Sequence, residues 1–240
     1  MIIGNEDAQS LLRGHMGLST NLLVYGPPGV GKYSLLTHEL ETRQIPFSLI
    51  LPDSNISEVR ESISHRETLV VRDAHRLSET AQDAFLKVME TDVRVMFVCD
   101  DIGLISDALL SRFQARVAFK PIDRDLFPDL SHSEYGLSDG SFVDAEYVRR
   151  NPDLIKWLLL LVAAKPVDLL LTPIPSFLKP ADKDESFLRV ISRGLLIAGR
   201  HRRQASHFAA LASDVLKTPS MNLGLHIHTM AVGLLNDSLD

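Results

Sequence analysis

The residues best suited to chemistry form a glycine-rich loop that follows the apolar run 21–25. The loop reads Gly26, Pro27, Pro28, Gly29, Val30, Gly31 and Lys32. Glycines at this spacing let successive backbone N–H groups converge on phosphate, and the lysine reaches the β and γ oxygens. A helical pattern over 34–40 follows, which is the setting a P-loop requires. We therefore predict that residues 26–34 bind the phosphates of ATP or ADP, the alternative being a glycine-rich turn without a ligand.

The residue after the lysine departs from this motif. A P-loop places Ser or Thr there, and its short hydroxyl ligates Mg²⁺. Here that residue is Tyr33, whose phenolic oxygen lies at the far end of a rigid ring, and Ser34 comes one position too late along the helix. The loop is expected to bind phosphate better than metal. We assign no metal ligand in the chain and expect Mg²⁺ to be poorly held.

A second departure lies at the end of the apolar run 68–72. P-loop ATPases place an acidic pair after such a strand, one carboxylate for Mg²⁺ and one to polarise water. Arg72 takes the first place and Asp73 the second. An arginine repels a divalent cation and can itself neutralise phosphate charge. Because positioned electrostatic groups are worth about 10²- to 10³-fold in rate each, little or no hydrolysis is expected. The alternative is an Arg72–Asp73 ion pair of purely structural value.

The elements that must position these residues are indicated by hydrophobic periodicity. Apolar runs that favour the strands of a buried parallel sheet occupy 21–25, 47–51, 68–72, 94–99 and 115–119. Helical faces recur between them, as over 56–63 and 81–88. Strands alternating with helices are typical of an α/β nucleotide-binding fold.

The chain becomes polar and rich in Ser, Asp and Gly from Asp123 to Asp144, so the sheet domain is predicted to be 1–122. A small helical unit, 123–164, ends in the helix that contains Trp157. Prolines follow, and then three helical stripes over 187–195, 208–215 and 223–234 predict a helical bundle in 165–240.

Composition excludes several classes of protein. The chain has 240 residues, 45% of them hydrophobic, and a net charge of −6. An acidic balance argues against a free-standing DNA-binding protein, and the single cysteine, Cys99, excludes a disulfide framework. The most apolar stretch, 157–164, is far shorter than the roughly 20 residues of a membrane helix. We expect a cytoplasmic protein without a membrane segment.

Several motifs together resemble DNA clamp-loader subunits of the AAA+ superfamily. Residues 73–90 are similar to the Walker B region and following helix of these subunits, and Ser111-Arg112-Phe113 occupies the place of their Ser-Arg-Cys box. The opening 2–4 resembles their adenine-side segment, and 221–235 resembles the last collar helix of bacterial delta-prime subunits. The resemblance spans the whole chain and is strongest over 21–120.

The resemblance implies an AAA+ P-loop domain in 1–122, a helical lid in 123–164 and a helical collar or oligomerisation domain in 165–240. It implies that Arg112 is an arginine finger, donated in trans to the ATP of a neighbouring subunit, and that Asp73 is a degenerate Walker B acid. A lone arginine that closes a helix is the structural alternative for Arg112.

Both sensor regions of the family are altered. Cys99-Asp100-Asp101 fills the first, where a small hydroxyl residue is usual, and Leu154 and Ile155 stand where ATPases place the arginine of the second. Arg149 and Arg150 lie just before the second-sensor positions. Losses of this kind are found in inactive delta-prime subunits.

The function implied is that of a noncatalytic, delta-prime-like subunit. It would join clamp-loader ATPase subunits in a pentamer-like hetero-oligomer that places a sliding clamp on primer-template DNA. Two alternatives stay open: an active AAA+ ATPase of a clamp loader or related remodelling complex, and a nucleotide-binding scaffold outside replication.

Overall fold

The computed structural model describes residues 4–52, 68–163, 185–199 and 209–214. The chain forms two compact units, Met1–Leu126 and Phe127–Asp240. The predicted helical faces over 56–63 and 223–234 lie outside the described residues, as do the opening residues 2–3 and the collar-like segment 221–235.

The first unit contains a five-stranded sheet in the order β2-β3-β4-β1-β5, with every neighbouring pair parallel. The strands are β1 (Leu22–Tyr25), β2 (Phe47–Ile50), β3 (Thr68–Val71), β4 (Val95–Cys99) and β5 (Ala115–Ala118). Each falls within one of the five predicted apolar runs. The prediction of an α/β fold with a parallel sheet is confirmed.

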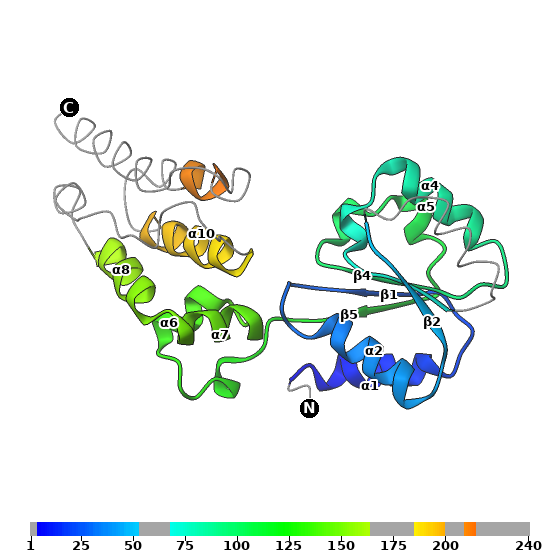
Figure 1. Ribbon diagram of the computed structural model, residues 1–240, viewed down its shortest axis with the longest axis horizontal. Helices are drawn as coiled ribbons and strands as arrows, with labels where there is room; N and C mark the ends of the chain where they lie inside the picture. The colour runs from blue at the N-terminus through cyan, green and yellow to red at the C-terminus, as the bar shows by residue number, and fades with distance from the viewer. Residues whose placement is uncertain (1–3, 53–67, 164–184, 200–208, 215–240) are drawn as a thin grey trace. The chain divides into compact units, whose positions relative to one another are not determined.

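Helices cover both faces of this sheet (Figure 1). One face carries α1 (Glu6–Met16) and α2 (Lys32–Thr42), and the other carries α4 (Glu79–Val88) and α5 (Asp107–Leu110). Phe97 of β4 is at the centre of the second layer, with its ring centroid 5.1 Å from those of both Phe85 and Phe113. Side chains alternate between faces along a strand, so the fully buried strands β3 and β4 contribute to both apolar layers, whereas β5 buries only alternate residues.

Because all strands are parallel, they all end on one side of the sheet, called here the carboxyl edge, and all begin on the opposite side. At the carboxyl edge, β1 runs into the glycine-rich loop, β3 into Asp73 and the 3₁₀ turn η1 (Ala74–Arg76), and β4 into Asp100 and η2 (Ile102–Leu104). Leu22, the first residue of β1, pairs with Ala115, the first residue of β5. The segment between α5 and β5 therefore lies at the opposite edge, where the strands begin.

The second unit is helical in all its described residues that have regular structure. Its helices are α6 (His132–Ser138), α7 (Phe142–Arg150), α8 (Pro152–Ala163) and α10 (Glu185–Gly199), followed by helical residues 209–214. The predicted stripe of Phe187, Ile191 and Leu195 is buried in α10. None of the helices in the described ranges is long and apolar enough to cross a membrane. The boundary between lid and collar stays a prediction.

A buried carboxylate connects the helices of this unit. The side chain of Asp144, in α7, is fully buried and accepts hydrogen bonds from Arg189 Nη2 at 2.8 Å and Arg193 Nη1 at 2.6 Å, both from α10. Arg193 Nη1 also donates to the carbonyls of Leu137 and Ser138 at the end of α6. The Asp144 carboxylate and the two guanidinium groups thus connect α6, α7 and α10.

Replacing Asp144 with Asn should destabilise the second unit by about 3–5 kcal/mol, because the two mostly buried guanidinium groups lose their shared counter-charge. Urea unfolding of the full chain, followed by circular dichroism, measures this change. Asp153→Asn is the matched control, since the Asp153 side chain is 86% exposed. Equal unfolding midpoints for the two variants would contradict this account of the cluster.

Candidate functional site

The glycine-rich loop connects β1 to α2 with a backbone that depends on glycine. Gly29 and Gly31 have φ of 73° and 90°, in the left-handed region that side chains disfavour. A Cβ on Gly26 would lie 2.2 Å from the carbonyl oxygen of Phe119, so the loop passes against the end of β5 at a distance that excludes a side chain. These constraints produce the compact loop that a P-loop requires.

The ammonium group of Lys32 makes hydrogen bonds to residues of its own loop and to Asp100. Lys32 Nζ donates to the carbonyls of Gly26 at 2.7 Å and Pro27 at 2.6 Å, and to Asp100 Oδ1 at 2.7 Å. The side chain is only 5% exposed. An ammonium group has three protons, so all of its donors are used. A phosphate that binds Lys32 must displace at least one of these acceptors, and Asp100 competes with it as an anion.

The two departures from the P-loop motif touch each other. The guanidinium carbon of Arg72 lies 5.0 Å from the ring centroid of Tyr33, which is a cation–π contact. Arg72 Nε also lies 3.5 Å from Asp73 Oδ2, and half of the Arg72 side chain is exposed. The ion pair considered from sequence is therefore present, together with a stacking contact that the sequence did not indicate. A stacked ring and a guanidinium occupy the positions whose residues hold the metal in a P-loop ATPase.

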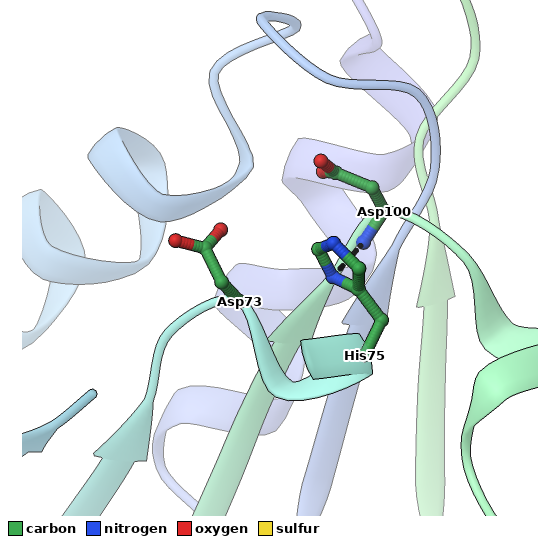
Figure 2. Close-up of side chains that lie close together, drawn as sticks. All are labelled: Asp73, His75 and Asp100. Atoms are coloured by element: carbon green, nitrogen blue, oxygen red, sulfur yellow. Dashed lines mark hydrogen bonds between the residues drawn. The ribbon is translucent and has the colours of Figure 1, made fainter. Parts of the chain in front are cut away.

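Three side chains at the carboxyl edge have the spacing of metal ligands. Asp73, His75 and Asp100 each offer an atom within 4.8 Å of the others (Figure 2). The Asp100 amide, however, donates to His75 Nδ1 at 3.2 Å, so a neutral imidazole carries its proton on Nε2 and has no free lone pair. This cluster was not predicted from the sequence. Its signal was that the residues follow the ends of two neighbouring strands, β3 and β4.

The residues present do not fit Mg²⁺. Mg²⁺ requires near-ideal octahedral oxygen ligation, and it binds through carboxylates, hydroxyls and phosphates. Asp100 is already paired with Lys32 and Asp73 with Arg72, while the tyrosine ring takes the place of the short hydroxyl. A divalent cation would have to displace both of the protein's own cations.

Residues 99–101, predicted to fill the place of the first sensor, make three different kinds of contact. Cys99 is buried, and burial raises the pKa of its thiol to about 12, so the thiol is protonated at neutral pH and is a poor nucleophile. Asp101 accepts from the Gly103 amide at 2.8 Å and caps η2. Asp100 is thus the residue of this segment that joins the loop.

Arg112 is separated from the other predicted site residues. It follows α5 and precedes β5, at the edge where the strands begin, and its Nη2 lies 2.9 Å from Glu90 Oε1. About half of each side chain is exposed. A four-residue strand rises roughly 10 Å, so the sheet separates Arg112 from the loop of its own chain. The structure brings residues 26–34, Asp73 and Asp100 together and leaves Arg112 apart.

The second-sensor residues belong to the second unit. Leu154 and Ile155 are buried there and offer no charge. Arg149 forms a paired contact with Asp129, with Nη2 to Oδ1 at 2.7 Å, and this hydrogen bond raises the pKa of Arg149 and lowers that of Asp129. Arg150 pairs with Glu146 at 2.8 Å. Both arginines have carboxylate partners within their own unit.

A distant relative of the chain is found among known proteins, although no family model matches it. A protein of Acanthamoeba polyphaga mimivirus that is named as a putative replication factor C small subunit is 29% identical over the matched region. That region covers 44% of this chain and 37% of the mimivirus protein, so the match spans little more than a third of the relative. The chain is thus similar, over part of its length, to a protein that carries this name.

The fold is shared with solved structures of low sequence identity. A DNA polymerase III gamma-subunit-related protein of Thermotoga maritima has a TM-score of 0.55 and 14% identity, covering 96% of this chain and 99% of its own. A point mutant of RuvB from the same organism has a TM-score of 0.52 and 17% identity, covering 93% and 87%. The chain's parallel sheet and the helical part after it therefore have a known fold, which these two structures share.

Replacing Asp100 with Asn should strengthen the binding of ADP by about tenfold, since the change removes the anion that competes with phosphate for Lys32. Titration with a fluorescent ADP analogue measures the dissociation constant. Asp101→Asn removes the same charge one residue away, where Asp101 caps η2, and should leave binding within about twofold. Unchanged or weaker binding by Asp100→Asn would contradict the competition.

Proposed function

We propose that this chain is a noncatalytic subunit of a DNA clamp loader, of delta-prime type. It holds nucleotide passively in the loop 26–34 and presents Arg112 to the ATP of a neighbouring ATPase subunit. The observation that carries this proposal is the contrast between the two sheet edges. The carboxyl edge has lost its metal-binding groups, while the opposite edge displays an exposed arginine in the position of the family's finger.

The chain's own site lacks the groups that make a P-loop hydrolyse ATP. Tyr33 replaces the hydroxyl ligand, Arg72 replaces an acid, and Asp100 stands beside the lysine where a γ-phosphate would be repelled. Losses of about 10²- to 10³-fold for each positioned group leave no useful turnover when combined. The remaining loop is suited to binding.

Arg112 is suited to a role in trans. Any phosphate that it contacts belongs to another molecule, because its own loop lies at the other edge of the sheet. Arg112 pairs with Glu90, and exposed ion pairs of this kind contribute roughly 0–1 kcal/mol. Arg112 can therefore leave Glu90 for a phosphate at little cost, and an arginine finger is worth about 10³- to 10⁵-fold in turnover.

The partners proposed are clamp-loader ATPase subunits, a sliding clamp, and primer-template DNA reached through the assembled complex. The distant similarity to a protein named as a putative replication factor C small subunit supports this choice. A net charge of −6 agrees with DNA contacts that are shared with partners. Residues 123–164 and 165–240 would be the lid and the collar of a pentamer-like hetero-oligomer.

The first test is steady-state ATP hydrolysis by the purified chain with primed DNA, with Lys32→Ala to reveal contaminating activity. We expect wild type and variant to show the same background rate, because the metal-binding groups are missing. Turnover that Lys32→Ala abolishes would replace the proposal with an active AAA+ ATPase.

The second test examines Arg112 in the assembled complex. The chain would be reconstituted with the clamp-loader ATPase subunits of its own genome, and DNA-stimulated hydrolysis compared for wild type and Arg112→Ala. A loss of about 10³-fold at the dependent site is expected, with assembly unchanged on size-exclusion chromatography. Arg124→Ala, which removes an exposed arginine of η3 (Arg124–Leu126), is the control.

Wild-type hydrolysis by the Arg112→Ala complex would exclude the finger role. Failure of the wild-type chain to join any clamp-loader subunit or sliding clamp would favour a nucleotide-binding scaffold outside replication.

A further inference from the structure

We infer that this site binds the diphosphate of a nucleotide without a divalent cation, and that the Arg72 guanidinium provides the counter-charge that Mg²⁺ provides in a P-loop ATPase. The inference rests on the proposed nucleotide binding by the loop 26–34. It concerns the ligand chemistry of that site and is independent of the role of Arg112.

The first step is the position of Arg72. Tyr33 directly follows Lys32 and lies in the first turn of α2, next to the last residues of the glycine-rich loop. The Arg72 guanidinium stacks on the Tyr33 ring at 5.0 Å, so a second cation lies one side chain away from the start of this helix. The helix start and the two cations together favour an anion at this place.

The second step is the availability of the Arg72 donors. The cation–π contact with Tyr33 is an electrostatic attraction to the ring, at 5.0 Å from its centroid, and the guanidinium keeps N–H groups for hydrogen bonds. The contact with Asp73 involves Nε at 3.5 Å, which is long for a hydrogen bond, and half of the side chain is exposed. The two terminal nitrogens can therefore bind two phosphate oxygens at once, as arginine commonly does.

The third step is the balance of charge. Lys32 and Arg72 contribute two positive charges, and Asp100 and Asp73 offset them. When a diphosphate enters, both cations can exchange a carboxylate for phosphate oxygens while keeping their other contacts: Lys32 with the carbonyls of Gly26 and Pro27, Arg72 with the ring of Tyr33. Two of the ligand's negative charges are then paired with side chains that are already in place.

Isothermal titration of the full chain with ADP, in EDTA and in excess Mg²⁺, tests this inference. We expect the two dissociation constants to agree within about threefold. Arg72→Gln should weaken binding in EDTA by about tenfold or more. Lys87→Gln, which removes one positive charge from an exposed position on α4, should leave binding within about twofold.

A second variant tests the same two positions in the opposite direction. Tyr33→Thr combined with Arg72→Asp restores a short hydroxyl and an acid, and should make ADP binding at least about tenfold tighter with Mg²⁺ than with EDTA. Thermal unfolding of each variant verifies that it is folded. Tyr33→Leu, which removes the phenol group that contacts Arg72, replaces any variant that does not fold.

The inference is overturned if wild-type ADP binding is about tenfold or more tighter with Mg²⁺, or if ADP binds in neither condition. Neither result affects the proposed finger, which is measured by the hydrolysis of a partner subunit. Conversely, an inert Arg112→Ala change in the assembled complex would remove the proposed function and leave metal-free binding standing.

Discussion

The common direction of the five strands is the constraint on which the rest of the first unit depends. Because all strands end at one edge, residues that follow different strands meet there: Lys32 after β1, Asp73 after β3 and Asp100 after β4. The same constraint places Arg112, which precedes β5, at the other edge beside Glu90. A parallel sheet of this kind can serve two molecules, since one edge can hold a ligand while the other faces a neighbour.

Within the carboxyl edge, the P-loop is held together by the chain's own groups. The passage of Gly26 against Phe119 fixes where the loop leaves the sheet, and the Lys32 ammonium bridges the carbonyls of Gly26 and Pro27 to Asp100. Hydrogen bonds that involve a charged group contribute about 1.5–3 kcal/mol each, so these three bonds stabilise the loop. The observed shape of the loop is therefore held by the chain's own groups.

The sequence predicted the elements better than the contacts between them. All five strands were predicted because short apolar runs such as Val95–Cys99, bounded by polar segments, are typical of the buried strands of a parallel sheet. The stack of Arg72 on Tyr33 could not be predicted, because it joins β3 to α2, and β4 lies between β3 and the strand that leads into α2. Likewise, helical periodicity predicted the apolar stripe of α10 but gave no sign that Asp144 would lie buried beneath its arginines. Such contacts depend on tertiary packing, which periodicity does not contain.

Lys32 also stabilises the loop in which it lies. Removing the Lys32 side chain would leave the carbonyls of Gly26 and Pro27 without their donor and Asp100 without its counter-charge. Because these residues are half-buried, each acceptor that loses its donor costs at most about 1–3 kcal/mol. Lys32 thus has a structural role that does not depend on hydrolysis, and its presence alone is no argument for catalysis. Tyr33 and Arg72 are more informative, because they contact each other beside the loop and make none of the hydrogen bonds of Lys32 that close it.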